Sequence, residues 1–237
     1  MTASTPTILA TCGGLNPGTW SDAVYGPLLL HAVELAGVSG RAPRVAHLNT
    51  AGGDQRFVEG QELEAARLAG VDASHLRFFP KRNVDDLEEY VLSRDVLWVS
   101  GGSVVNLLAV WRAHGLDAIL ERAWRAGVVL AGGSAGAVCW HAGGTTTSFG
   151  PSVEPVVDAL GLIPASLGVH HDSDPHRRPA LLNAVRDGIL PDGYAVDEGV
   201  GIVYSGTEPV DFVTETAGQR AWRVTATGET PIETRKL

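Results

Sequence analysis

The sequence predicts an α/β fold: a doubly wound, mostly parallel β-sheet flanked by helices, with a C-terminal β-hairpin at its edge. Over the first two-thirds of the chain, short β-branched or apolar runs alternate with longer segments of helical period, as in successive β-α units. Residues 95–100 are almost wholly apolar, as expected for a strand that is covered on both faces. The last third instead contains short strands, and residues 210–214 and 221–225 around Gly218 form the predicted hairpin.

The individual elements follow from hydrophobic periodicity and from Gly and Pro positions. The predicted strands are residues 7–11, 44–48, 76–79, 95–100, 128–131, 194–196 and 201–204, besides the hairpin. The predicted helices are residues 21–36, 57–68, 85–92, 105–124 and 179–185. Ser21 is the expected N-cap of the first helix, Pro27 falls inside it, and Gly115 interrupts helix 105–124. No repeat or linker divides the chain, so residues 1–237 are expected to form one domain.

Composition narrows the function classes. The 237 residues carry 18 Lys+Arg against 27 Asp+Glu, a formal net charge of -9 without a basic run, which argues against a nucleic-acid partner. No apolar run approaches the ~20 residues of a membrane span, and the N-terminus lacks the basic segment of a signal peptide. Two cysteines make no disulfide framework. A cytoplasmic protein without a membrane partner is expected; its oligomeric state, a homodimer included, stays open.

The strongest chemical signal is the sequence Gly-Gly-Ser-Ala-Gly-Ala at residues 132–137, directly after strand 128–131. It matches G-x-S-x-G, the strand–turn–helix motif in which a serine nucleophile occupies a sharp turn between small neighbours. The amide of Ala135 then lies at a helix N-terminus and can donate to a developing oxyanion. A phosphate-binding loop is the alternative, but neither G-x-G-x-x-G nor a following Lys is present. Ser134 is therefore the expected nucleophile.

A second glycine pair, Gly101 and Gly102, ends strand 95–100. Because ligands bind at the carboxyl ends of parallel strands, this turn is expected to lie on the same edge of the sheet as Ser134. Gly102 is the natural second oxyanion donor, and a plain βα turn is the alternative.

The expected general base lies in the polar cluster at residues 170–176, His-His-Asp-Ser-Asp-Pro-His. Three histidines and two aspartates also suit a zinc site, although the spacing matches no H-E-x-x-H or C-x-x-C pattern. The orienting carboxylate is expected to be Glu198, in the sequence Val-Asp-Glu-Gly at residues 196–199, with Asp197 and Asp172 as alternatives. The order Ser, His, Glu differs from the Ser, Asp, His order of α/β-hydrolases.

These motifs, together with Leu-Gly-Leu-Ile-Pro at residues 160–164, resemble the peptidase E (aspartyl dipeptidase) and cyanophycinase family of serine peptidases. The resemblance runs from about residue 42 to the C-terminal hairpin. It implies a fold similar to class I glutamine amidotransferases, with Ser134 as nucleophile, His170 as base and Glu198 as its carboxylate. Gly102 and Ala135 match the oxyanion donors, and His171 fills an aromatic position of the motif.

The same resemblance implies a cofactor-free serine exopeptidase that hydrolyses short peptides, dipeptides above all. Aspartyl dipeptidases have a longer segment after the histidine, with an arginine that pairs with the substrate aspartate. Here the segment is compressed, and Arg177 or Arg178 is the candidate for that contact. Because Asp172 and Asp174 lie close by, strict Asp-X specificity is not expected. The alternatives are a cyanophycinase-like or small-ester hydrolase, or a catalytically silent amidotransferase-like binding scaffold.

Overall fold

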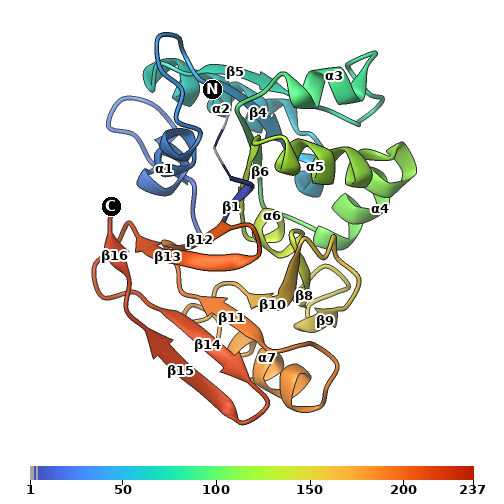
Figure 1. Ribbon diagram of the computed structural model, residues 1–237, viewed down its shortest axis with the longest axis vertical. Coiled ribbons are helices and arrows are strands. Elements are labelled where there is room, and N and C mark those ends of the chain that lie inside the picture. The colour runs from blue at the N-terminus through green and yellow to red at the C-terminus, as the bar shows by residue number, and fades with distance from the viewer. Residues whose placement is uncertain (1–2, 4) are drawn as a thin grey trace.

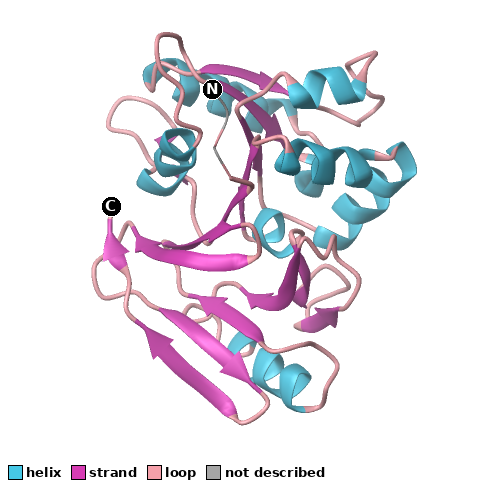
Figure 2. Ribbon diagram, viewed as in Figure 1, coloured by secondary structure: helices cyan, strands magenta, loops and turns pink. Residues whose placement is uncertain are grey.

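The computed structural model describes residue 3 and residues 5–237 and contains two main sheets (Figures 1 and 2). In spatial order the larger sheet comprises β16 (Arg235–Lys236), β13 (Glu208–Thr214), β12 (Val200–Ser205), β1 (Thr7–Thr11), β7 (Val129–Gly133), β6 (Val96–Val99), β4 (Arg44–Leu48) and β5 (Asp72–His75). The smaller sheet comprises β15 (Gly228–Ile232), β14 (Ala221–Thr225), β11 (Gly193–Val196), β10 (Ile163–Gly168), β8 (His141–Thr146) and β9 (Glu154–Val156). Strands β2 (Leu15–Asn16) and β3 (Val24–Tyr25) form a separate ribbon.

The larger sheet has helices on both faces. The helices of the chain are α1 (Pro27–Leu35), α2 (Arg56–Leu68), α3 (Leu87–Leu92), α4 (Val104–His114), α5 (Leu116–Arg125), α6 (Ala135–Val138) and α7 (Arg177–Arg186), with a 3-10 turn η1 (Thr50–Gly52). Along β1, Leu9 faces the core that α1 and α2 cover, whereas Ile8 and Ala10 face the core that α3, α4 and α5 cover. Strands β1, β7, β6, β4 and β5 are mutually parallel. The predicted doubly wound, mostly parallel α/β fold is confirmed.

The smaller sheet lies below the larger one in Figure 1, with α7 against it. Its strands β8, β10 and β11 are parallel, while β9, β14 and β15 run antiparallel to their neighbours. One hydrophobic cluster contains residues of both sheets, Ile8 and Ile202 from the larger and Ile163 and Leu167 from the smaller. The two sheets therefore share a core.

Two predicted elements of the first half were wrong in their bounds. Residues 21–26 do not continue α1: Val24 and Tyr25 pair with β2, and the helix begins at Pro27, whose missing N–H costs nothing at that position. The strand predicted at residues 76–79 lies at Asp72–His75 instead. The amides of Phe78 and Phe79 donate to the Asp54 carboxylate and therefore do not pair with a neighbouring strand.

The predicted C-terminal hairpin was wrong in its strands: the hairpin at the edge of the smaller sheet is formed by β14 and β15. Residues 210–214 and 221–225 are both in strands, β13 and β14, but these belong to different sheets. β13 pairs with β12, and β14 pairs with β11 and β15. The break predicted in helix 105–124 is confirmed, because Gly115 has φ +69° and separates α4 from α5.

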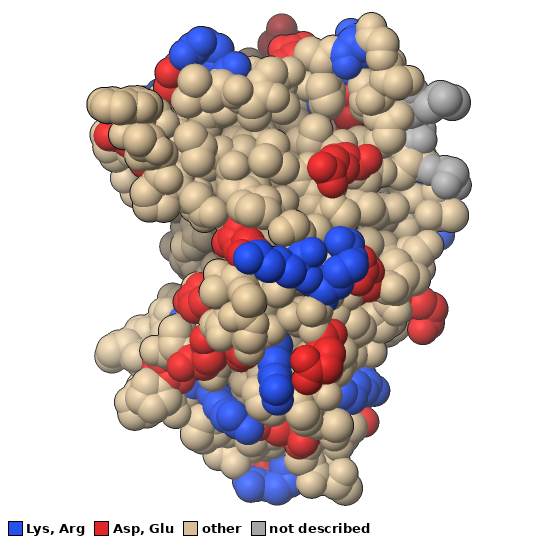
Figure 3. Space-filling view, turned by 90° about the vertical axis from the view of Figure 1, so that its left-hand side faces the viewer, with Lys and Arg blue, Asp and Glu red and all other residues tan. Residues whose placement is uncertain are grey.

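The surface carries charges of both signs. On the face shown in Figure 3, the Lys and Arg side chains are interspersed with Asp and Glu side chains. Pairs such as Arg235 with Asp211 and Arg112 with Asp158 are within 3.0 Å. None of the helices that the structure describes has the length and apolar character needed to cross a bilayer.

Candidate active site

Ser134 occupies the sharp turn between β7 and α6. Its backbone has φ 56° and ψ −114°, a combination that a non-glycine residue adopts only when the surrounding structure holds it there. The amide of Ser134 donates to the carbonyl of Thr11 at 3.0 Å, which fixes the turn to β1. A Cβ on Gly136 would lie 2.1 Å from the carbonyl oxygen of Val99, so only glycine lets α6 pack this closely on β6. The G-x-S-x-G pattern is therefore required by packing, and it raises the serine out of the strand.

Strands of both sheets end at this site. Ser134 follows β7 of the larger sheet, whereas His170 follows β10 and Glu198 follows β11, two adjacent parallel strands of the smaller sheet. The Ser134 Oγ lies 2.9 Å from His170 Nε2. His170 Nδ1 in turn forms a short hydrogen bond with Glu198 Oε1. With Nδ1–H donating to the carboxylate, Nε2 is left to accept the serine proton.

Two further hydrogen bonds hold Glu198 in place. Ser173 Oγ donates to its Oε1 at 3.0 Å, and its backbone amide donates to Asp172 Oδ1 at 2.9 Å. Partial burial acts to raise the pKa of Glu198, but the hydrogen bond and charge of His170, with donors Cys12 and Ser173, hold that pKa below its ordinary value. The carboxylate is ionised at neutral pH and oriented toward the imidazole.

The neighbouring candidates have other partners. Asp197 accepts hydrogen bonds from the Arg220 amide and the Trp222 indole, and Asp172 accepts from Gln219 as well as from the Glu198 amide. His171 is buried and its Nε2 contacts Glu229 at 2.8 Å. Of the adjacent histidines and acidic residues, the structure brings His170 and Glu198 to Ser134.

The backbone amides of Gly102 and Ala135 have no acceptor among the described residues. Both residues line a small cavity of about 30 Å³ that also borders Ser134. Gly102 has φ +139°, and a Cβ there would lie 2.4 Å from the carbonyl oxygen of Ala51. The two amides are therefore free to act as the oxyanion donors that the sequence predicts.

The predicted arginines are separated by the fold. Arg177 opens α7 and borders the small cavity beside Ser134, with its Nε 3.8 Å from Asp174. Thr145 borders the same cavity, and its Oγ1 is buried without a partner among the described residues. Arg178 instead forms an ion pair with Glu229 and lies 4.6 Å over the Trp222 ring, so it does not reach the nucleophile.

A larger cavity of about 400 Å³ opens on the other side of Ser134 and His170. Its charged lining groups are two carboxylates, Glu62 and Glu198. Glu62 is 1% exposed and accepts hydrogen bonds from Ser100, Asn49 and His75. Burial alone would raise the pKa of Glu62, but His47 through its charge and hydrogen bond, with His75 and Asn49, lowers it below the ordinary range. Glu62 is therefore ionised in the wall of this cavity, and the lining contains neither Lys nor Arg.

Sequence reasoning missed Glu62 and Cys12. Glu62 lies four residues after Val58 and three before Ala65 on the buried face of α2. A carboxylate within an otherwise apolar helical face is the sequence signal that could have pointed to this residue. Cys12 directly follows β1, at the edge where functional residues gather. Its Sγ lies 3.2 Å from His170 Nδ1 and 3.3 Å from Glu198 Oε2.

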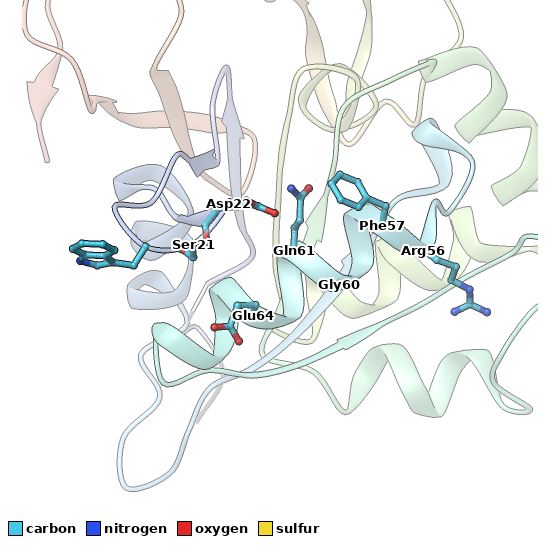
Figure 4. Close-up of a pocket in the computed structure, with 9 residues that line it drawn as sticks. Ser21, Asp22, Arg56, Phe57, Gly60, Gln61 and Glu64 are labelled. Carbon is cyan, nitrogen blue, oxygen red and sulfur yellow. Dashed lines mark hydrogen bonds between the residues drawn. The ribbon is translucent and has the colours of Figure 1, made fainter.

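A second hollow, of about 500 Å³, is drawn with its lining residues in Figure 4. Its walls come from the loop between β2 and β3, with Ser21 and Asp22, and from α2, with Phe57, Gln61 and Glu64. It contains neither Ser134 nor His170. We therefore place the chemistry in the cavity next to the serine, although the other hollow is larger.

Comparison of the sequence with known proteins finds peptidases. The model of peptidase family S51 matches residues 28–210. An uncharacterized peptidase of Bacillus subtilis (strain 168), YgaJ, is 37% identical over 182 residues, which cover 77% of this chain and 78% of YgaJ.

Two crystal structures share the fold at low identity. A putative peptidase E protein from Listeria monocytogenes EGD-e matches with a TM-score of 0.59 and 17% identity, over 87% of this chain and 98% of the other. A peptidase from an acI-B1 Actinobacterium matches with a TM-score of 0.66 and 18% identity, over 97% and 95% of the two chains.

Proposed function

The chain belongs to peptidase family S51 and is a serine peptidase of the peptidase E type, and we propose that it is an exopeptidase acting on short peptides through Ser134, His170 and Glu198. The observation that carries the proposal is the unbroken hydrogen-bond chain from Ser134 Oγ through His170 to the Glu198 carboxylate, built on a strained elbow.

The proposed reaction follows from the protonation states of the three side chains. Ser134 Oγ attacks the scissile carbonyl carbon while His170 Nε2 takes its proton, and the Gly102 and Ala135 amides bind the carbonyl oxygen as it becomes negative. His170 then gives that proton to the leaving amine as the C–N bond breaks. A water molecule, deprotonated by the same nitrogen, hydrolyses the acyl-enzyme, and Glu198 stabilises the imidazolium in both steps.

The charge around the serine supports a preference for free peptide ends. The larger cavity, with the Glu62 carboxylate in its wall, attracts the ammonium group of an unblocked N-terminus and disfavours an acidic side chain. On the other side of Ser134, Arg177 can bind a substrate carboxylate, together with the unpartnered Thr145 hydroxyl. A dipeptide zwitterion carries both charges within a few bonds, so it fits this arrangement better than an internal segment of a protein.

The test combines active-site labelling with a substrate panel. A fluorophosphonate should label the wild-type chain and fail to label Ser134→Ala, whose hydrolysis rate should fall roughly 10⁴- to 10⁶-fold while its circular dichroism is unchanged. Cys139→Ala is the matched control, because Cys139 is buried behind the elbow helix and touches no triad residue. Near-native turnover by Ser134→Ala would exclude it as the nucleophile.

The substrate panel tests the exopeptidase part on its own. Dipeptides with neutral first residues should be cleaved at least as fast as Asp-X dipeptides, and N-acetylation should slow each of them at least tenfold. Hydrolysis of Asp-X alone would establish a strict aspartyl dipeptidase instead. Equal rates for free and acetylated peptides would remove the role assigned to the acidic cavity.

A further inference from the structure

Three metal-ligating side chains meet at the back of the triad. A thiol (Cys12), an imidazole (His170) and a carboxylate (Glu198) offer ligand atoms that all lie within 4.8 Å of one another. It is the one such grouping among the residues that the structure describes, and it draws a single residue from the polar cluster 170–176. The peptidase mechanism uses the imidazole and the carboxylate, but it gives the thiol no task.

We propose that Cys12, His170 and Glu198 form an inhibitory site for a thiophilic divalent cation, with Zn²⁺ as the best fit. Zn–S and Zn–N bonds of roughly 2.3 and 2.1 Å at a tetrahedral angle place sulfur and nitrogen about 3.6 Å apart. Cys12 Sγ lies 3.2 Å from His170 Nδ1 and 3.3 Å from Glu198 Oε2, so the sulfur needs to move by only a few tenths of an ångström. The hydrogen bond between His170 Nδ1 and Glu198 Oε1 has to open to admit the ion. A hard cation such as Mg²⁺ does not favour this thiol-containing set.

The site is reachable although the cysteine is buried. Cys12 is 1% exposed, but the side chains of His170 and Glu198 are 27% and 45% exposed, and both border the 400 Å³ cavity. A cation entering from the cavity meets these two ligands first and keeps a solvent molecule as its fourth ligand. Protein supplies three positions and solvent the fourth, the composition of an open zinc site.

Negative charge at the site attracts a divalent cation. The Glu198 carboxylate is itself one of the three ligands, and the Asp172 carboxylate accepts a hydrogen bond from the Glu198 backbone amide. On binding, the thiol proton goes to solvent and the thiolate becomes the metal ligand, so metal uptake releases a proton.

Occupancy would disable the base by changing its tautomer. In the free protein His170 carries its proton on Nδ1, which donates to Glu198. A metal on Nδ1 leaves the neutral imidazole with its proton on Nε2, the atom that lies 2.9 Å from Ser134 Oγ. Nε2 then has no lone pair for the serine proton, so the switch rests on the proposed role of His170.

Cobalt titration of the full chain tests the site without any assay of activity. Co²⁺ added to chelator-treated protein should give the near-ultraviolet thiolate-to-cobalt absorption at one ion per chain. Cys139→Ala and His171→Phe should retain it, and Cys12→Ala should lose it; Cys12→Ser replaces the alanine variant if circular dichroism shows that the latter fails to fold. A wild-type protein without the band, or a Cys12 variant that keeps it, overturns the site.

Zinc inhibition of fluorophosphonate labelling tests the switch. Zn²⁺ should slow labelling of the wild type at least tenfold, EDTA should restore it, and Mg²⁺ should have no effect. For Cys12→Ala, with labelling expressed relative to its own metal-free rate, half-maximal inhibition should need at least tenfold more Zn²⁺ than for the wild type. Equal zinc sensitivity of the two proteins overturns the switch. Absence of labelling before any metal is added would count against the proposed peptidase mechanism, and the cobalt band would still decide whether the site exists.

Discussion

The larger and the smaller sheet contribute to the site in different ways. The larger sheet supplies the proposed nucleophile, Ser134, and the free amides of Gly102 and Ala135 from neighbouring strand ends, within a contiguous β-α pattern. The smaller sheet supplies His170 and Glu198 from β10 and β11, and the contact between the sheets completes the hydrogen-bond chain. The residues proposed to bind and attack the carbonyl group therefore come from neighbouring strands of one sheet. The residues proposed to transfer protons reach Ser134 only because the two sheets are in contact.

This difference has a consequence for mutagenesis. Substitution of His170 or Glu198, which follow strands of the smaller sheet, should affect proton transfer more than substrate binding, since neither residue forms the elbow. The following experiments test that separation, beginning with the largest effect.

His170→Ala should lower kcat/KM about as much as loss of the nucleophile, roughly 10⁴- to 10⁶-fold, because no other base contacts Ser134 Oγ among the described residues. Steady-state kinetics on a free dipeptide measure it. The matched control is His171→Phe, which removes the adjacent imidazole. This imidazole pairs with Glu229 and packs on Trp222, so its loss should cost about 1–3 kcal/mol of stability and leave most of the activity. Loss of activity in His171→Phe with retention in His170→Ala would reassign the base.

Glu198→Gln should lower kcat by about 10²- to 10⁴-fold with little change in KM. The amide keeps the shape of the side chain but cannot stabilise the imidazolium that forms in the transition state. Asp197→Asn is the matched control: Asp197 accepts from the Arg220 amide and the Trp222 indole and has no contact with His170. If Asp197→Asn lowers kcat as much as Glu198→Gln does, the assignment of the orienting carboxylate fails.

The same contrast between the sheets explains what the sequence could predict. The elbow at Ser134 and the turn at Gly102 are motifs of a few consecutive residues, so local pattern was enough to recognise them. The contacts that require their glycines come from elsewhere in the chain, from Val99 for Gly136 and from Ala51 for Gly102. Strand pairing in the last third is non-local: β13 and β14 are adjacent in sequence, yet they pair in different sheets. Periodicity identifies strands but does not select their partners, which is why the hairpin was wrong.

The residues of the candidate site also differ in how far the sequence could predict them. His170 and His171 are adjacent residues of the same type, so only the register of the family motif favoured His170 as the base. In the structure His170 contacts Ser134 and Glu198, whereas His171 contacts Glu229. Cys12 stands in the sequence 158 positions before its imidazole partner, and no motif links them. Contacts of this kind arise when two sheets dock, and spacing does not reveal them.

Arg177→Ala should raise KM for a free dipeptide by about 10- to 100-fold and affect kcat less, since a charge-assisted contact with a substrate carboxylate is present before and during the chemical step. Amidation of the C-terminus of the substrate, or removal of an acidic side chain, identifies which carboxylate is bound. Arg178→Ala is the matched control, because Arg178 is occupied by Glu229 and Trp222. An equal rise of KM in both variants would mean that the effect is not a substrate contact.

The smallest expected effect is on the stability of the contact between the two sheets and not on catalysis. His141 begins β8 of the smaller sheet; its Nδ1 donates to the Ala137 carbonyl of the elbow helix, and its Nε2 accepts from the Tyr204 hydroxyl on β12 of the larger sheet. Complete burial lowers the pKa of His141 to about 4, against an ordinary value near 6.5. The unfolded chain therefore binds a proton at higher pH than the folded chain does.

It follows that the stability contributed by neutral His141 is fully present above about pH 6.5 and is lost as the pH falls toward about 4. Between about pH 7.5 and about pH 5 this residue should account for about 2 kcal/mol of the fall in unfolding free energy, measured by urea titration. His141→Gln should be less stable at neutral pH but show a smaller fall, whereas His176→Gln, at an exposed position, should fall as the wild type does. An unchanged pH dependence in His141→Gln would show that this imidazole does not couple protonation to the contact between the two sheets.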